Sequence, residues 1–155
     1  YQWEHHCDLM KGLHAYDSTL HHHNGLWWLF ACVAAEKGMS GNEELHLFYA
    51  ETPLSRTWIA HPLNPIISDA SKARPAGQLF EKNGYLYRPS QDCAGSYGAG
   101  LNINRIKTLD KQCYLEELVH CARPTWDAKL TALHTLNFNQ HVSVADAMRV
   151  DNRFA

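Results

Sequence analysis

Two Asn-Gly pairs, Asn24-Gly25 and Asn83-Gly84, constrain the possible folds of this chain more than any other feature. Each pair follows a short strand-like run and precedes an aromatic-rich one, residues 26–30 and 85–88. An Asn-Gly pair favours the type I′ turn, in which both central residues adopt positive φ, so each is predicted to close a β-hairpin. The pairs are about 60 residues apart, which indicates a repeated structural unit.

The segments that follow each hairpin match as well, because each hairpin precedes two further strand-like runs. Four consecutive strands per unit are typical of one blade of a β-propeller. The runs 114–121 and 144–149 can also be drawn as short helices, but the repeat favours a strand for the first. A third unit starts near Thr131. The runs assigned as strands after the hairpins and in the third unit are 44–50, 57–60, 101–106, 114–119, 133–140 and 141–144.

The predicted fold is therefore all-β, with about two full four-stranded blades and two partial ones. Two or three blades cannot close a ring and would leave strand edges exposed, so we expect either more chain or association of copies. The first residue is Tyr1 and not Met, which favours an excerpt of a longer chain. The expected divisions are the end of a preceding blade at 1–12, with its last strand within residues 1–11, blades at 13–62 and 70–122, and the start of another at 128–155.

Composition excludes several classes of partner. The 14 Lys and Arg residues nearly balance the 16 Asp and Glu residues and form no basic stripe, which argues against nucleic acid. The longest apolar run, 26–35, is too short to cross a bilayer. No signal peptide or cofactor motif is visible. The five cysteines are scattered and odd in number, which slightly favours unpaired thiols in a cytoplasmic, reducing compartment and leaves a disulfide as the alternative.

Several motifs together resemble one family. They are His-Pro-Leu-Asn-Pro-Ile-Ile-Ser-Asp at 61–69, Ala-Arg-Pro-Ala-Gly at 73–77, Leu-Tyr-Arg-Pro-Ser-Gln-Asp-Cys at 86–93 and Leu-His-Thr-Leu-Asn at 133–137. This combination is similar to the β-propeller region in the N-terminal part of plant glucosamine inositolphosphorylceramide transferases and of bacterial relatives. The resemblance covers about residues 17–148.

That resemblance implies a five-bladed propeller like that of glycoside hydrolase family 43, without implying hydrolase activity. In the plant proteins, the transferase chemistry is associated with a separate C-terminal domain. The expected partners are therefore a sugar or glycan ligand, the remaining blades and an additional domain.

Three polar residues, Asp17, Arg74 and His134, stand at or just before the first strand of their units. First strands line the axis of a propeller, so these side chains are predicted to meet in one funnel. Asp17 is the candidate general base or sugar ligand, or alternatively a turn cap. Arg74 and His134 are candidate substrate-binding residues. The alternatives are a structural ion pair of Arg74 with Asp69 or Asp92, and a core position for His134.

The end of the second hairpin supplies three more candidates. Gln91 and Arg88 are predicted to bind substrate hydroxyls, and Asp92 is a second candidate catalytic carboxyl group or a turn stabiliser. Glycoside hydrolysis requires two facing carboxyl groups, and only Asp17 and Asp92 are candidates. Glu116 and Glu117 are expected to be solvated. The run His21-His22-His23 is not assigned as a metal site, because only two of its imidazoles share a strand face.

Three functions are consistent with these features. The favoured one is a carbohydrate-recognition propeller that serves a glycosyltransferase or other sugar-modifying domain. The second is an inverting glycosidase-like hydrolase that uses Asp17. The third is a structural propeller that mediates assembly without catalysis.

Overall fold

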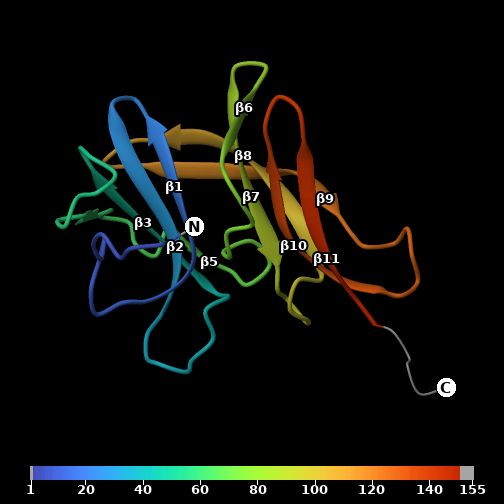
Figure 1. The fold of residues 1–155 in the computed structure, drawn as a ribbon. Coiled ribbons are helices and arrows are strands. Elements are labelled where there is room, and N and C mark those ends of the chain that lie inside the picture. Colours follow the sequence, from blue (N-terminus) through green and yellow to red (C-terminus); the bar gives the residue numbers. More distant parts are fainter. Residues whose placement is uncertain (1, 151–155) are drawn as a thin grey trace.

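The computed structural model describes residues 2–150, and these residues form strands and loops without a helix (Figure 1). The strands make three antiparallel sheets, none of which closes into a barrel. The first sheet holds β1 (His14–His23), β2 (Leu26–Ala34), β3 (Glu44–Ala50), β4 (Ile59–Ala60) and β5 (Ile67–Ser68); the second holds β6 (Phe80–Lys82), β7 (Tyr85–Asp92), β8 (Gly100–Leu109) and β9 (Tyr114–Ala122); the third holds β10 (Leu130–Phe138) and β11 (Ser143–Arg149). The predicted all-β class is confirmed.

Both Asn-Gly hairpins form as predicted. Asn24 and Asn83 have φ of 50° and 53°, and Gly25 and Gly84 both have φ of 76°. Positive φ at both central residues is the requirement of the type I′ turn. The turns join β1 to β2 and β6 to β7, and Figure 1 shows them at the same end of the molecule as the β10–β11 turn.

The run 44–50 is confirmed with the bounds of β3, and the remaining strand predictions are confirmed in position but differ in length. β8 and β9 extend beyond the predicted runs, whereas β4 has only two residues. The run 144–149 lies within strand β11. The prediction of a strand within residues 1–11 is wrong, because the described residues 2–11 form a loop. Tyr1 and residues 151–155 lie outside the described part of the chain.

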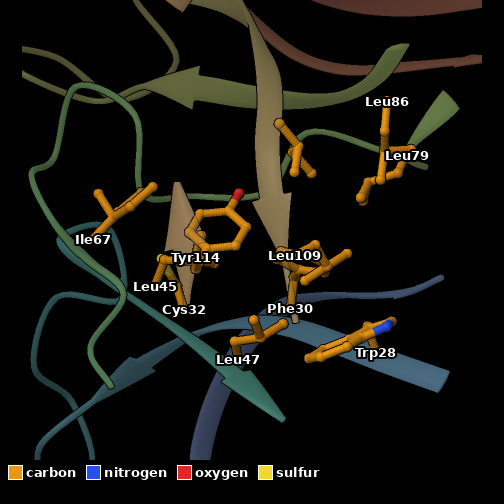
Figure 2. Packing of buried hydrophobic residues seen from close by; sticks show 12 residues of the cluster. Trp28, Phe30, Cys32, Leu45, Leu47, Ile67, Leu79, Leu86, Leu109 and Tyr114 are labelled. Carbon is orange, nitrogen blue, oxygen red and sulfur yellow. The ribbon is translucent and has the colours of Figure 1, made fainter. Parts of the chain in front are cut away.

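The main core lies between the first and second sheets (Figure 2). Phe30 of β2 contacts Tyr114 of β9 edge to face, with ring centroids 5.9 Å apart. Burial of large apolar side chains from both sheets excludes water from this interface and supplies most of its stability. The buried members are Trp28, Phe30, Cys32, Leu45, Leu47, Ile67, Ala73, Leu79, Leu86, Ile106, Leu109 and Tyr114.

A smaller core joins the second sheet to the third. Ala76, Leu101 and Leu133 form its buried centre. Because these side chains are fewer and smaller than those of the main core, the third sheet is attached by much less buried apolar surface.

The segment 75–79, just before β6, connects the three sheets near their first strands. Its Ala76 carbonyl accepts a 2.8 Å hydrogen bond from the Leu136 amide of β10. On the other side, the Gly77 carbonyl accepts a 3.4 Å bond from the Thr19 hydroxyl of β1. Gly77 has φ of 120°, and a Cβ there would lie 2.1 Å from the Leu136 carbonyl oxygen, so only glycine fits. Residues from all three sheets therefore meet at this segment.

All five cysteines are free thiols. The residues that the structure describes include no helix with the length and apolar character that a membrane-spanning helix needs.

Candidate functional site

Asp17 lies on β1 at an irregularity of the strand. The pairing register of β1 with β2 shifts between Tyr16 and Thr19, and Asp17 has φ of 50°. Asp is one of the few residues that tolerate this left-handed conformation, because its short polar side chain can bond locally. Backbone of this kind is concentrated at functional sites. The Asp17 side chain remains 41% exposed.

Arg74 holds the Asp17 carboxylate from the loop between β5 and β6. Its Nε donates to Asp17 Oδ2 at 2.6 Å, and its Nη1 donates to Asn42 Oδ1 at 2.5 Å. The guanidinium lies between two rings, 5.7 Å from the centroid of Tyr16 and 5.0 Å from that of Tyr97. Burial acts to lower the pKa of Arg74, but the bond to Asp17 and its charge outweigh burial and raise it.

The ion-pair partner of Arg74 is therefore Asp17, and neither Asp69 nor Asp92. Asp69 accepts bonds from the amide and hydroxyl of Ser71. These bonds lower the pKa of Asp69.

Gln91 reaches Asp17 from β7. Its side chain is buried, and its Nε2 donates to Asp17 Oδ2 at 2.9 Å and to the Pro75 carbonyl at 3.1 Å. Asp17 Oδ2 thus accepts two side-chain bonds, one from the β5–β6 loop and one from β7. Asp17 Oδ1 has no hydrogen-bond partner among the described residues, so one carboxylate oxygen is left for a ligand.

His134 lies on β10 and joins the same group through Tyr97. The two ring centroids are 4.8 Å apart. His134 Nδ1 is 3.4 Å from Asp146 Oδ2 of β11, and its Nε2 is buried without a hydrogen bond to the described residues. A Cβ on Gly98 would lie 2.7 Å from the imidazole, so glycine allows this close approach. Asp17, Arg74 and His134 therefore lie in one continuous chain of contacts, in which Tyr97 is the link.

Asp92 is engaged in other contacts. Its Oδ2 accepts a 2.6 Å bond from Arg123, and its Oδ1 accepts a 3.0 Å bond from the Ala94 amide. Both carboxylate oxygens are thus bound within the chain, in contacts of the kind that the turn-stabilising alternative requires.

Arg88 is buried in the core, away from the exposed carboxylate of Asp17. It is fully buried, and its guanidinium donates hydrogen bonds of 2.9 and 2.7 Å to the Glu116 carboxylate of β9. Tyr114 donates a further, short bond to Glu116. The expectation of a solvated Glu116 is wrong, because its carboxylate bonds Arg88 of β7 across the intervening strand β8. Glu117 is solvated and pairs with Arg105.

Burial raises the pKa of the Tyr114 hydroxyl well above its usual range, and the charge of Arg88 acts in the opposite direction.

The three consecutive histidines lie at the end of β1. His21 and His23 share a face, with ring centroids 6.1 Å apart, whereas His22 contacts Trp27. Within residues 2–150, no three His, Cys, Asp or Glu side chains are grouped closely enough to hold a metal ion.

Sequence reasoning missed three members of the group around Asp17, namely Tyr16, Asn42 and Tyr97. Asn42 and Tyr97 lie in loops, whose position relative to the sheets is not encoded in strand periodicity. A usable signal was the Tyr97-Gly98 pair, because Gly98 has φ of 66° and marks a close approach of the loop to β10.

The family model and the similar curated proteins point to the same family. The family model described as "Glucosamine inositolphosphorylceramide transferase 1, N-terminal" matches residues 1–142. Glucosamine inositolphosphorylceramide transferase 1 of Oryza sativa subsp. japonica is 45% identical over 102 residues, which are 64% of this chain and 14% of that protein. The Arabidopsis thaliana protein of the same name is 37% identical over 102 residues, which are 64% of this chain and 13% of that protein. No solved structure matches. The chain therefore spans about a seventh of the length of these relatives.

Proposed function

This chain belongs to the family of the glucosamine inositolphosphorylceramide transferase 1 N-terminal region, and from that premise we propose that it is a carbohydrate-recognition domain associated with a sugar-modifying domain. The relatives are named as transferases and are about seven times longer than the matched segment. A domain of this kind would hold a glycan while a separate domain performs the transfer.

The observation that carries this proposal is the half-exposed carboxylate of Asp17. Arg74 of the β5–β6 loop and Gln91 of β7 fix its Oδ2 and leave its Oδ1 open. A carboxylate held rigidly in this way is a strong acceptor for a sugar hydroxyl, and preorganisation reduces the entropy lost on binding.

Recognition is favoured over hydrolysis because the second candidate carboxyl group, that of Asp92, is already bonded within the chain. An inverting glycosidase requires an acid and a base, both free to act on the bond. Asp17 offers a free oxygen, whereas both oxygens of Asp92 are occupied by Arg123 and Ala94. Release of a chromophore from aryl glycosides by the intact protein, abolished in Asp17→Asn, would support hydrolysis instead.

We also propose that the three sheets are successive blades of a five-bladed propeller, with divisions at 13–62, 70–122 and 128–155 and with 1–12 belonging to a preceding blade. The contacts of segment 75–79 with β1 and β10 support a shared axis at the first strands. A structure of the intact protein in which these sheets belong to one two-layer sandwich would contradict it.

Binding of the intact protein to a glycan array, followed by affinity measurement on any positive glycan, tests the recognition function. Asp17→Asn and Arg74→Ala are each expected to weaken binding by about tenfold or more, since a charge-assisted hydrogen bond contributes roughly 1.5–3 kcal/mol.

Asp8→Asn is the matched control. Asp8 is a half-exposed aspartate paired with His5 in the N-terminal loop, and its replacement should leave affinity unchanged. Failure of the wild-type protein to bind any glycan would refute the recognition function.

A further inference from the structure

The group around Asp17 is balanced in charge. Its one permanent cation, Arg74, is paired with Asp17 at 2.6 Å. The neighbouring His134 is paired with Asp146, and the nearby Arg123 is paired with Asp92. No surplus positive charge is therefore present in this group, which a phosphate or diphosphate ligand would need.

The Arg74 side chain is fixed by hydrogen bonds and ring contacts in addition to its ion pair. Its Nε and Nη1 are committed to Asp17 and Asn42, and its guanidinium is flanked by the rings of Tyr16 and Tyr97. Asp17 occupies Nε, so an anion could use the side-on fork formed by Nε and an Nη group only by displacing that carboxylate. Nη2 has no hydrogen-bond partner among the described residues, so its N–H groups are available as donors.

Tyr97 completes the set of available polar atoms. It is 46% exposed, and its hydroxyl has no hydrogen-bond partner within the described chain. The Tyr97 ring contacts both the guanidinium of Arg74 and the imidazole of His134, and these contacts position it. The hydroxyl can act as donor or acceptor.

We infer that this group binds the neutral, vicinal hydroxyls of a sugar or cyclitol ring and rejects the phosphate or diphosphate portion of a charged ligand, with Tyr97 as a further specificity-determining residue. The inference rests on the proposed recognition function and names its ligand class. Asp17 Oδ1 accepts a hydrogen bond from one hydroxyl, and Arg74 Nη2 donates to another. The Tyr97 hydroxyl bonds a third polar atom of the ring.

The experiment compares neutral and anionic probes by chemical-shift titration of the intact protein. The neutral probes are methyl glucopyranoside, methyl galactopyranoside and myo-inositol, and the anionic probes are glucose 6-phosphate and uridine diphosphate. At least one neutral probe is expected to bind with an affinity about tenfold or more higher than that of either anion. A site without net positive charge offers no electrostatic attraction to offset the desolvation of a phosphate.

Two variants sharpen the test. Tyr97→Phe keeps the ring contacts and removes only the hydroxyl, so affinity for the neutral probe should fall about two- to tenfold. Asp17→Asn frees the Arg74 charge, so binding of glucose 6-phosphate should increase about tenfold while neutral binding falls. The control Asp8→Asn removes one negative charge in the N-terminal loop and should change neither.

The outcomes separate the inference from the proposed function. The inference would be overturned if an anionic probe bound with the same or higher affinity than every neutral probe. It would also be overturned if Tyr97→Phe left the affinity for the neutral probe unchanged. Either result would leave the proposed glycan recognition in place. Absence of binding by every sugar, on the array and in titration, would overturn both.

Discussion

At the residue scale, the ion pair of Arg88 with Glu116 is almost fully buried. Both side chains are removed from water, with exposures of 0% and 6%. Two buried charges that compensate each other add little net stability, whereas one left alone is severely unfavourable. The pair therefore makes the two positions interdependent.

The first prediction follows from this interdependence. Arg88→Met and Glu116→Leu are each expected to lower the free energy of unfolding by about 3–5 kcal/mol, because each leaves an uncompensated buried charge. The double variant should lose clearly less than the sum. Urea denaturation of the four proteins measures the coupling.

Arg105→Met is the matched control on the neighbouring strand. Its pair with Glu117 is partly exposed, at 28% and 44%, so the change should cost only about 0–1 kcal/mol. Equal losses for Arg88→Met and Arg105→Met would contradict the buried-pair account.

The second prediction concerns thiol reactivity. Burial raises the pKa of Cys32 to about 12, so its thiol remains protonated at neutral pH and is a poor nucleophile. Cys113 and Cys121 are exposed. Alkylation with iodoacetamide at neutral pH, followed by mass spectrometry, should modify Cys113 and Cys121 and spare Cys32. Labelling of Cys32 in the folded protein at a comparable rate would refute this.

The same residues show the limits of sequence reasoning at this scale. Glu116 was expected in solvent because strand position predicts a face but does not reveal a partner 28 residues earlier in the chain. Asp17 and Arg74 were each identified as chemically suited to a site. Their direct pairing depends on the packing of two sheets, which no local pattern encodes.

At the scale of elements, the hairpin turns are where local sequence determines structure most completely. Asn83 and Gly84 both adopt positive φ, and the space around Gly84 is open. The requirement for glycine there is therefore a backbone requirement and does not come from packing. This explains why the two hairpins could be predicted from four residues.

The third prediction tests that requirement. Gly84→Val is expected to lower the free energy of unfolding by about 1–2 kcal/mol, the cost of placing a side chain in the left-handed region. Gly84→Asn should cost less, because Asn tolerates that region. Thermal unfolding monitored by circular dichroism compares them, and equal losses for the two variants would argue against a backbone origin.

Strand edges and lengths were less predictable than strand positions. β4 has two residues and β8 has ten, although the corresponding predicted runs, 57–60 and 101–106, were closer in length. Pairing with neighbours sets these ends, since a strand continues only while a partner supplies hydrogen bonds. The loop before β1 shows the same point, because residues 2–11 were predicted as a strand and form none.

At the scale of the whole molecule, the three sheets differ in how firmly they are held. The first two share a large apolar core, whereas the third shares with the second the small buried cluster of Ala76, Leu101 and Leu133 and the ring contact of Phe80 with Phe138. All residues of β11 are exposed. Local opening is easiest where buried apolar contacts are few. The sequence predicted the order of the sheets but could not predict this imbalance, which depends on how side chains meet between sheets.

The fourth prediction is a gradient of hydrogen exchange. Backbone amides of β10 and β11 should exchange faster than those of β2, β7 and β8, by about a hundredfold or more if opening free energies differ by 3 kcal/mol. Exchange followed by mass spectrometry of peptides gives the comparison. Uniform protection across all three sheets would show that they unfold as one unit.

The short run at 75–79 limits how this protein can be engineered. Its backbone bonds to strands on both sides, and Gly77 leaves no room for a side chain. New termini made by circular permutation, or a split into two complementing halves, should therefore be placed in the exposed loop at 51–57 and not at 75–79. A break at Gly77 would separate Arg74 from Gln91, the two residues that bond the Asp17 carboxylate.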